Sequence, residues 1–136
     1  MTQALQQILI VEDDPAIRMV LRMLLECNGY RVFEAETAMR GEVEARTHKP
    51  DLVLVDLGLP DADGLELIRH LRSRSRVPII VVSARTAQEQ KALALRAGAD
   101  DYITKPFAGL ELLARIGVRL GKVGASGKEF LQSPCQ

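Results

Sequence analysis

Three short apolar runs, at residues 8–11, 52–55 and 79–82, constrain the fold of this chain most strongly. Polar side chains follow each run: Glu12, Asp13 and Asp14 after the first, Asp56 after the second and Ser83 after the third. Four apolar residues bounded by turn residues are typical of a strand buried on both faces, as in a parallel sheet covered by helices. Because parallel strands end at a common edge, where open α/β sheets place their sites, we expect one pocket that holds several acids and a hydroxyl.

Strand and helix patterns alternate along the rest of the chain. The expected strands are residues 7–11, 30–34, 52–55, 77–82 and 101–104, and the expected helices are 15–27, 38–47, 65–71, 87–97 and 108–120. Asp14, with Pro15 after it, predicts the start of the first helix, and Asp63 with Glu66 predicts a capping box at the third. Gly41 is expected to interrupt the second helix. Five strand–helix units of about 20–27 residues allow the right-handed crossovers of a parallel sheet, so we predict an α/β fold with a doubly wound (βα)5 sheet.

The composition argues against several classes of function. The chain has 18 basic and 18 acidic side chains, so it lacks the basic footprint of a nucleic-acid binder. It has no Trp, two Tyr and three Phe, and therefore offers few surfaces on which bases or sugars could stack. No apolar stretch approaches the roughly 18 residues that cross a membrane, so we expect a cytoplasmic protein without membrane contact.

The length predicts one domain with a short appendage, since typical domains have about 100–150 residues. Apolar residues make up 47% of the 136, which is enough for a core. From Gly121 onward the apolar periodicity ends and Gly and Ser become frequent. We therefore expect a domain over residues 1–121 and a flexible tail, or the start of a linker, over residues 122–136.

The acids that follow the first and third expected strands predict a metal site. Glu12, Asp13 and Asp56 would lie close together, and like charges raise one another's pKa unless a cation neutralises them. Mg²⁺ suits such a site because it binds one or two carboxylates together with waters and a phosphate. Helix capping and loop solvation are the alternative roles for these acids, and capping is the role that we favour for Asp14.

Lys105 follows the fifth expected strand and precedes Pro106, so its ammonium group would reach the same edge of the sheet. Phosphoryl transfer requires such a cation, because charge spreads over the transferring oxygens and catalysis is mainly positioning and electrostatics. Ser83, at the end of the fourth strand, could donate its hydroxyl to a phosphate oxygen. Taken alone, such a lysine is usually a solvated charge, but the position of Lys105 directly after an apolar strand and before Pro106 favours the functional role. A serine at the position of Ser83 is, taken alone, as often a turn residue as a functional one.

These residues and their spacing resemble those of the receiver domain of bacterial two-component response regulators. The segments that match are 11–14, 54–60, 82–84 and 99–107, within a resemblance that runs from residue 7 to residue 120. The segments 32–35, 56–61 and 82–85 are similar to the KdpE branch of the OmpR-type subfamily, a branch that responds to potassium limitation and turgor. The resemblance implies the CheY-like, flavodoxin-like fold with strand order 2-1-3-4-5.

The resemblance also implies chemistry at Asp56. This residue would be the phospho-acceptor, attacking a phosphohistidine of a partner sensor histidine kinase to form an aspartyl phosphate. Mg²⁺ would be bound by Asp13 and Asp56, by the backbone carbonyl of Gly58, and through water by Glu12, which stands where the family commonly has Asp. The domain would catalyse only its own phosphotransfer and autodephosphorylation, so we expect a signalling domain and not an enzyme.

The family also implies a switch. Ser83 would bind a phosphoryl oxygen and Lys105 would pair with the phosphate. Movement of the hydroxyl residue couples in the family to an aromatic residue on the fifth strand, here Tyr102. The peptide between Lys105 and the following proline is often cis. Gly58 and Arg85 stand at positions that tune the lifetime of the acyl phosphate, so the rate of dephosphorylation stays open.

The output surface would be the face formed by the fourth helix, the fifth strand and the fifth helix. Its charged residues alternate in sign, and they are Lys91, Asp100, Asp101, Glu111, Arg115 and Arg119. In the OmpR-type subfamily such residues form ion pairs across a symmetric dimer, so we expect a homodimer that phosphorylation favours. An ordinary solvated charged surface is the alternative, since exposed ion pairs contribute only about 0–1 kcal/mol each.

An OmpR-type regulator carries a winged-helix DNA-binding domain after its receiver, whereas this chain ends at Gln136. We therefore expect the receiver part of a transcription regulator, which would contact DNA only through a missing effector domain. The alternative is a stand-alone receiver that acts through protein contacts.

Two other classes of protein share part of this pattern. A flavodoxin-like FMN carrier has the same strand order, but it needs a loop rich in hydroxyl groups and glycine after its first strand, where this chain has three acids. A phosphatase of the haloacid-dehalogenase type also forms an aspartyl phosphate, but it needs a second acid two residues after the nucleophile, where this chain has Gly58.

Overall fold

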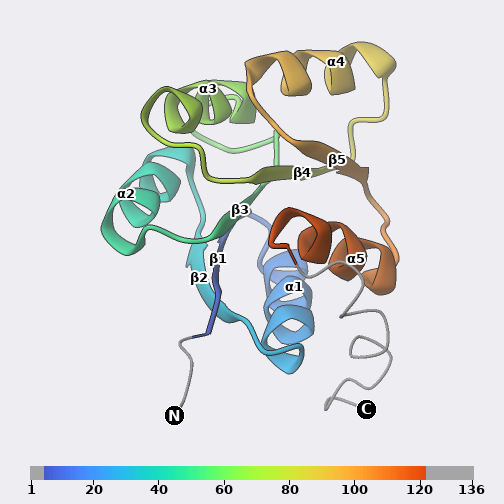
Figure 1. Ribbon diagram of the computed structural model, residues 1–136. Helices are drawn as coiled ribbons and strands as arrows, with labels where there is room; N and C mark the ends of the chain where they lie inside the picture. The colour runs from blue at the N-terminus through green and yellow to red at the C-terminus, as the bar shows by residue number, and fades with distance from the viewer. Residues whose placement is uncertain (1–4, 122–136) are drawn as a thin grey trace.

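Five strands and five helices alternate along the chain in the computed structural model, which describes residues 5–121 (Figure 1). The strands are β1 (Gln7–Val11), β2 (Arg31–Ala35), β3 (Leu52–Val55), β4 (Ile79–Ser83) and β5 (Asp101–Thr104). The helices are α1 (Pro15–Cys27), α2 (Ala38–His48), α3 (Gly64–Arg74), α4 (Gln88–Ala97) and α5 (Gly109–Arg119). The tail or linker expected over residues 122–136 lies outside the described residues.

The sheet has the predicted order β2-β1-β3-β4-β5, and all its neighbouring strands are parallel. The register pairs Val11 with Val55, and Val55 with Val81. Residues that follow paired positions lie at the same edge of the sheet. The pairing therefore brings Glu12 and Asp56 to a common carboxyl edge.

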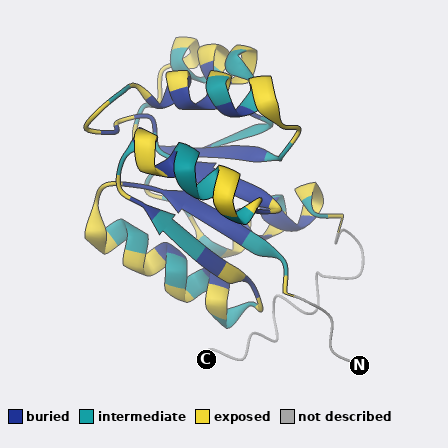
Figure 2. Cartoon of the chain, turned by 90° about the vertical axis from the view of Figure 1, so that its left-hand side faces the viewer, coloured by how far each residue is buried: buried dark blue, intermediate teal, exposed yellow. Residues whose placement is uncertain are grey.

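Helices cover both faces of the sheet, with α1 and α5 on one face and α2, α3 and α4 on the other (Figure 1). Alternate strand residues face two apolar cores. Leu9 and Val53 belong to the core beneath α2, α3 and α4, whereas Ile10 and Leu54 belong to the core beneath α1 and α5. Figure 2 shows the central strands as buried and the outer faces of the helices as exposed. Burial on both faces explains why the strand segments are apolar runs without polar alternation.

Local sequence fixes the ends of several helices. The carboxylate of Asp14 accepts the N–H of Ala16 at 2.9 Å, and Pro15 is the first residue of α1, as predicted. Gly29 follows the end of α1 with a φ of 88°, a left-handed conformation that glycine adopts readily. Gly98 ends α4 in a similar way, with a φ of 126°.

Two local predictions are wrong. Helix α2 runs through Gly41 without interruption, and a Cβ atom at this position would lie 2.9 Å from the side chain of Val11. The glycine thus allows α2 to pack closely on β1. The predicted capping box at α3 does not form, because Asp63 accepts an N–H of the first turn while Glu66 pairs with Arg69 at 3.2 Å.

Most element boundaries match the predicted ones or differ from them by a single residue, as at β2, which begins at Arg31. The larger differences are that β4 begins at Ile79 and that α3 continues to Arg74. Pro78 has no N–H to donate to a neighbouring strand, which delays the start of β4. In the last turn of α3, Arg72 donates to the carbonyl oxygen that ends α4 at 3.0 Å, so a tertiary contact supports the extra turn.

The helices are short and cover a single sheet. The longest of them, α1, has 13 residues. Within residues 5–121, no helix combines the length and the apolar character that crossing a membrane requires.

Candidate functional site

Three carboxylates converge at the carboxyl edge of the sheet. Ligand atoms of Glu12, Asp13 and Asp56 all lie within 4.8 Å of one another. Backbone hydrogen bonds hold the segments that carry them: the N–H of Asp56 donates to the carbonyl of Val11 at 3.0 Å, and that of Glu12 donates to the carbonyl of Ala35 at 3.0 Å. The structure thus brings together the acids that follow β1 and β3.

Lys105 reaches the same cluster from the loop after β5. Its Nζ atom lies 2.7 Å from Oε1 of Glu12 and 3.3 Å from Oδ2 of Asp56. The N–H of Lys105 donates to the carbonyl of Ser83 at 2.9 Å, and the peptide before Pro106 is cis, as the family resemblance suggested. The side chains of Lys105, Glu12 and Asp56 are 15%, 2% and 12% exposed, so these ion pairs lie largely out of water.

Burial and charge shift the pKa values in this cluster. Burial raises the pKa of Glu12 to about 7, although hydrogen bonds from Lys105 and from the N–H of Asp14 act to lower it. Burial alone would lower the pKa of Lys105, but its hydrogen bond to Glu12 and the attraction of Asp56 raise it above the ordinary value. Lys105 is therefore a constant cation near neutral pH, whereas Glu12 titrates there.

Ser83 and Tyr102 are linked through the backbone of one residue. The Oγ atom of Ser83, which is buried, accepts the N–H of Arg85 at 3.1 Å. The hydroxyl of Tyr102 donates to the carbonyl oxygen of Arg85 at 2.6 Å. A displacement of Ser83 would therefore act on the segment to which Tyr102 is bonded.

Gly58 and Arg85 border the loop that carries Asp56. The N–H of Gly58 donates to Oδ1 of Asp56 at 3.3 Å. The guanidinium group of Arg85 contacts the side chain of Gln90 at 3.2 Å and lies 3.5 Å from that of Asp63. Of the two residues expected to tune the lifetime of an acyl phosphate, Gly58 thus lies in the loop after β3, and Arg85 packs against that loop.

Asp61, in the same loop, caps α2, a role that sequence reasoning missed. Its carboxylate accepts the N–H of Ala38 at 2.8 Å and that of Met39 at 3.0 Å. These hydrogen bonds, led by the one from Met39, lower the pKa of Asp61. The cap joins residues 23 positions apart, so no local pattern could reveal it.

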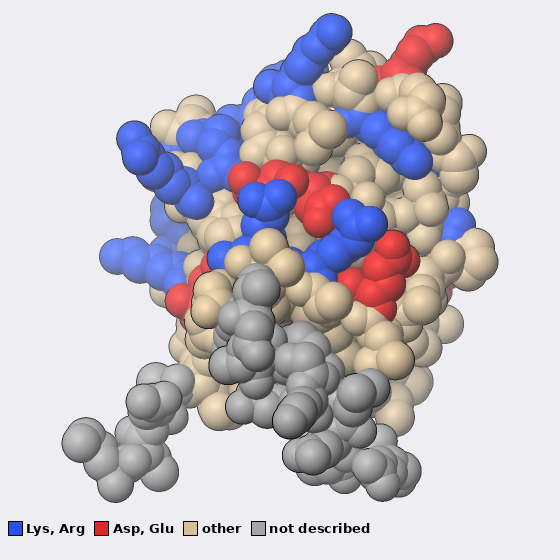
Figure 3. Space-filling view, turned by 45° about the vertical axis from the view of Figure 1, so that its right-hand side comes forward, with Lys and Arg blue, Asp and Glu red and all other residues tan. Residues whose placement is uncertain are grey.

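Three residues of the expected dimer face pair within the chain. Arg115 lies 2.7 Å from the carboxylate of Asp101 and 3.2 Å from that of Glu111. Figure 3 shows acidic and basic groups intermixed on the side of the molecule that carries β5 and α5. If these three residues formed ion pairs with a second copy of the chain, their present ion pairs within the chain would first have to break.

The other three residues of that face have different contacts. The carboxylate of Asp100 pairs with Arg72 of α3 at 3.0 Å, while its carbonyl oxygen accepts from Arg119 at 2.9 Å. The ammonium group of Lys91 lies 5.9 Å from the centre of the Tyr102 ring. The carboxylate of Asp100 therefore already has a partner on α3.

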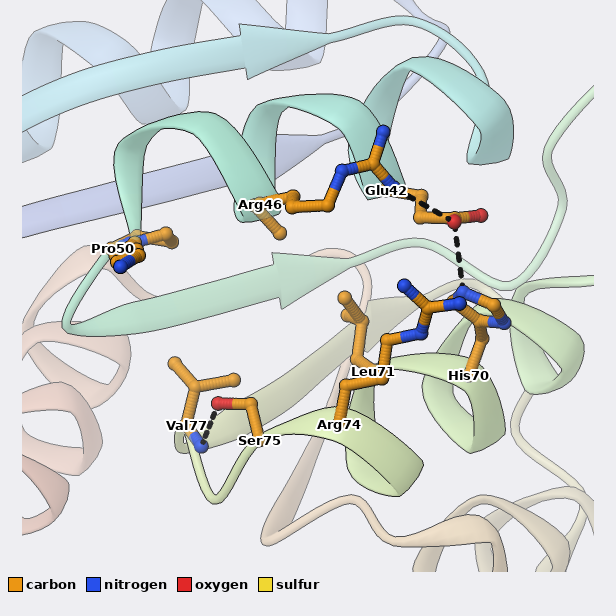
Figure 4. Close-up of a pocket in the computed structure, with 10 residues that line it drawn as sticks. Glu42, Arg46, Pro50, His70, Leu71, Arg74, Ser75 and Val77 are labelled. Carbon is orange, nitrogen blue, oxygen red and sulfur yellow. Dashed lines mark hydrogen bonds and ion pairs between the residues drawn. The ribbon is translucent and has the colours of Figure 1, made fainter.

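A largely apolar hollow lies beside Lys105. It has a volume of about 640 Å³ and includes Ile17, Val20 and Phe107 in its lining. A separate pocket of about 320 Å³ lies between α2 and α3 at the opposite edge, where Glu42 contacts His70 at 2.8 Å (Figure 4). That pocket shares no residue with the acidic cluster.

The donor set fits Mg²⁺. Opposite ligands of an octahedral Mg²⁺ are about 4.2 Å apart, because each metal–oxygen bond is about 2.1 Å long. The three carboxylates lie within 4.8 Å of one another, close enough to share one such ion directly or through water. Three carboxylates and the ammonium of Lys105 sum to a formal charge of −2 when all are ionised, which one divalent cation balances.

Comparison with known proteins agrees with this geometry. The response regulator receiver domain family matches residues 8–117 of the chain. The KDP operon transcriptional regulatory protein KdpE of Escherichia coli K12 is 58% identical over 119 residues, which cover 88% of this chain and 53% of that protein. The chain thus spans about half the length of the curated relatives that it matches.

Solved receiver domains share the fold. The beryllofluoride-activated N-terminal receiver domain of RstA from Klebsiella pneumoniae is 35% identical, with a TM-score of 0.82 over 85% of this chain and 98% of that one. The receiver domain of a sensor histidine kinase from Pseudomonas aeruginosa is 35% identical, with a TM-score of 0.81 over 87% and 99%. That second structure has a magnesium ion coordinated in its active-site cleft.

Proposed function

The chain belongs to the response regulator receiver domain family and is KdpE-like, and from this premise we propose that it accepts a phosphoryl group on Asp56 with the help of Mg²⁺. The observation that carries the proposal is the convergence of Glu12, Asp13, Asp56 and Lys105 in one cluster. A nucleophile, a set of metal ligands and a fixed cation are the parts that phosphoryl transfer needs.

Asp56 is the proposed nucleophile. Its carboxylate oxygen would form a bond to phosphorus while the P–N bond of a phosphohistidine breaks and the imidazole leaves. The carboxylate is oriented beforehand, because Oδ1 accepts the N–H of Gly58 and Oδ2 lies beside Lys105. Such fixed orientation lowers the entropic part of the barrier.

Lys105 and Ser83 are the proposed partners of the transferred group. Lys105 would exchange its contact with Asp56 for one with a phosphoryl oxygen, where negative charge develops. The Oγ atom of Ser83 accepts a hydrogen bond from Arg85, which leaves the proton of its hydroxyl free to be donated. If Ser83 moved to donate to a phosphoryl oxygen, it would shift the backbone of Arg85, to which it is hydrogen-bonded. Tyr102, the proposed switch residue, would respond because its hydroxyl donates to the carbonyl oxygen of Arg85.

Mg²⁺ would supply neutralisation of the clustered carboxylates and of the phosphoryl oxygens. Asp13 and Asp56 are proposed as direct ligands, together with the backbone carbonyl of Gly58. Glu12 is proposed to act through water, since its carboxylate is already paired with Lys105.

Asp13→Asn is expected to stabilise the metal-free protein and to remove its response to Mg²⁺. Repulsion of Asp13 by two neighbouring carboxylates costs about 1 kcal/mol, so its loss raises the melting temperature by roughly 4 °C. In the wild type, Mg²⁺ at a hundred times its dissociation constant adds about 2.7 kcal/mol to the free energy of unfolding. Scanning calorimetry in EDTA and in Mg²⁺ measures both effects.

Asp14→Asn is the matched control for that measurement. Asp14 caps α1, and asparagine caps a helix as well as aspartate does, so this variant is expected to keep the full response to Mg²⁺. An Asp13→Asn protein that Mg²⁺ stabilises as much as it does the wild type would remove Asp13 from the metal site.

The proposed phosphate donor is a sensor histidine kinase, and the proposed setting is the cytoplasm. We assign the receiver domain to residues 1–121 and a tail or linker to residues 122–136. The Escherichia coli relative is a transcriptional regulatory protein, which supports transcriptional output of the whole protein through a DNA-binding effector domain. A receiver acting alone through protein contacts is the alternative. In either case the domain would catalyse only its own phosphorylation and its own dephosphorylation.

We further propose that phosphorylation favours a homodimer through α4, β5 and α5. Tyr102 lies on β5 and is bonded to the segment that contacts Ser83, so an event at Asp56 has a physical route to this face. The pair between Arg115 and Asp101 would open within one copy and form again between copies.

Sedimentation velocity tests the dimer directly. The wild type treated with Mg²⁺ and beryllofluoride, a mimic of the phosphoryl group, is expected to sediment as a dimer at tens of micromolar, and Arg115→Glu as a monomer. Arg40→Glu, on α2, is the control and is expected to dimerise like the wild type. Treated wild type that sediments only as a monomer would contradict the proposal.

A further inference from the structure

Arg18, in the first turns of α1, binds the backbone of the loop that carries the acidic cluster. Its Nη1 atom donates to the carbonyl oxygen of Glu12 at 2.8 Å and to that of Asp13 at 3.3 Å. We propose that Arg18 is a positioning residue for the metal site, one that fixes the loop so that its carboxylates converge before the ion arrives. This inference rests on the proposed function, since it concerns the same Mg²⁺ site.

The guanidinium group is itself held from the other side. Its Nε atom donates to Oε1 of Glu34, at the end of β2, at 2.8 Å, and Nη2 lies 3.4 Å from the carboxylate of Glu36. The Arg18 side chain is only 13% exposed. Hydrogen bonds on two edges of the planar guanidinium group hold the Arg18 side chain in one orientation. Arg18 therefore links β2 rigidly to the loop after β1.

The choice of atoms explains why this bridge does not compete with the metal. The two hydrogen bonds from Arg18 to the loop go to backbone carbonyl oxygens. Lys105 differs, because its ammonium group binds the carboxylates of Glu12 and Asp56 themselves. Arg18 can therefore orient Glu12 and Asp13 without occupying any of their carboxylate oxygens. Groups that orient metal ligands in this way commonly set the affinity of the site.

Arg22 offers a matched comparison one turn further along α1. It forms an ion pair with Glu34, the same carboxylate that holds Arg18, and another with Glu26 at 3.3 Å. Within the described part of the chain, its ion pairs are with these two acids and its hydrogen bonds do not reach the loop after β1. Replacing Arg18 or Arg22 thus removes a partner of Glu34, but only the first replacement frees the loop.

Calorimetric titration of the whole chain with Mg²⁺ tests the inference, using Arg18→Gln and Arg22→Gln. Arg18→Gln is expected to weaken Mg²⁺ binding about tenfold, the lower end of what lost support of metal ligands costs. Arg22→Gln is expected to stay within about twofold of the wild type, as for other exposed pairs. Amide hydrogen exchange without metal supplies a second readout: residues 12–14 exchange faster in Arg18→Gln and unchanged in Arg22→Gln.

Each outcome bears on the inference. Wild-type affinity in Arg18→Gln, or equal weakening in both variants, would overturn the positioning role while leaving the proposed function intact. A wild type that binds no Mg²⁺ would overturn both. If Arg18→Gln does not fold, Arg18→Met takes its place, because methionine keeps an unbranched apolar side chain but cannot donate a hydrogen bond to the loop. Wild-type affinity in that variant would equally overturn the role.

Discussion

Lys105→Met is expected to lower the free energy of unfolding by about 2–3 kcal/mol at pH 8 and to slow phosphorylation of Asp56 by a factor of about 100 to 1,000. The stability loss follows because Lys105 compensates Glu12, whose side chain is 2% exposed. The rate loss follows because the fixed cation beside Asp56 is removed from the place where phosphoryl charge develops.

The stability loss in Lys105→Met is expected to grow with pH. Burial raises the pKa of Glu12 to about 7, so at pH 5 this carboxyl is mostly protonated and needs no cation. As pH rises through 7 the folded wild type ionises Glu12 beside Lys105, whose own raised pKa keeps it charged. In the variant, the pKa of Glu12 in the folded state is expected to rise further, because the lysine no longer compensates its charge. The difference in the free energy of unfolding between wild type and variant therefore grows from about pH 7 up to that higher pKa.

Urea unfolding at pH 5 and pH 8 measures this dependence, and incorporation of phosphate from acetyl phosphate measures the rate. Lys49→Met is the control, because Lys49 lies in the pocket at the opposite edge of the sheet. Its stability and labelling are expected to match those of the wild type. Equal losses of stability at both pH values in Lys105→Met would show that Glu12 does not depend on Lys105.

The fold could be predicted because its determinants are local runs. A segment such as Leu52–Val55 is apolar throughout, which indicates burial on both faces, and the turn residues around it limit its length. Packing between distant elements could not be predicted. Gly41 was expected to break α2, yet it serves the close approach of the helix to Val11, a contact visible only once the sheet is assembled.

The candidate site could be predicted in part for a related reason. Asp56 and Asp13 directly follow buried strands, so the parallel topology alone brings them to one edge. The contact from Lys105 to Glu12 spans 93 positions of the chain, and its choice of carboxylate depends on the tertiary fold. Arg18 was missed because it is a polar residue within an amphipathic helix, where a solvated role is the ordinary expectation.

Asp56→Asn is expected to lose the whole of the phosphoryl labelling that the wild type acquires from acetyl phosphate. In the wild type a carboxylate oxygen of Asp56 forms the new bond to phosphorus and acetate leaves. An amide in its place keeps the size of the side chain but lacks the anionic nucleophile. Removing one of three clustered negative charges also relieves repulsion, so loss of labelling in this variant does not arise from unfolding.

Mass spectrometry of the intact protein, after incubation with acetyl phosphate and Mg²⁺, is therefore the most direct test of the central claim. We predict one added phosphoryl group on the wild type and on the Asp14→Asn control, none on Asp56→Asn, and none on the wild type in EDTA. Equal labelling of Asp56→Asn and the wild type would contradict the assignment of Asp56 as the phospho-acceptor.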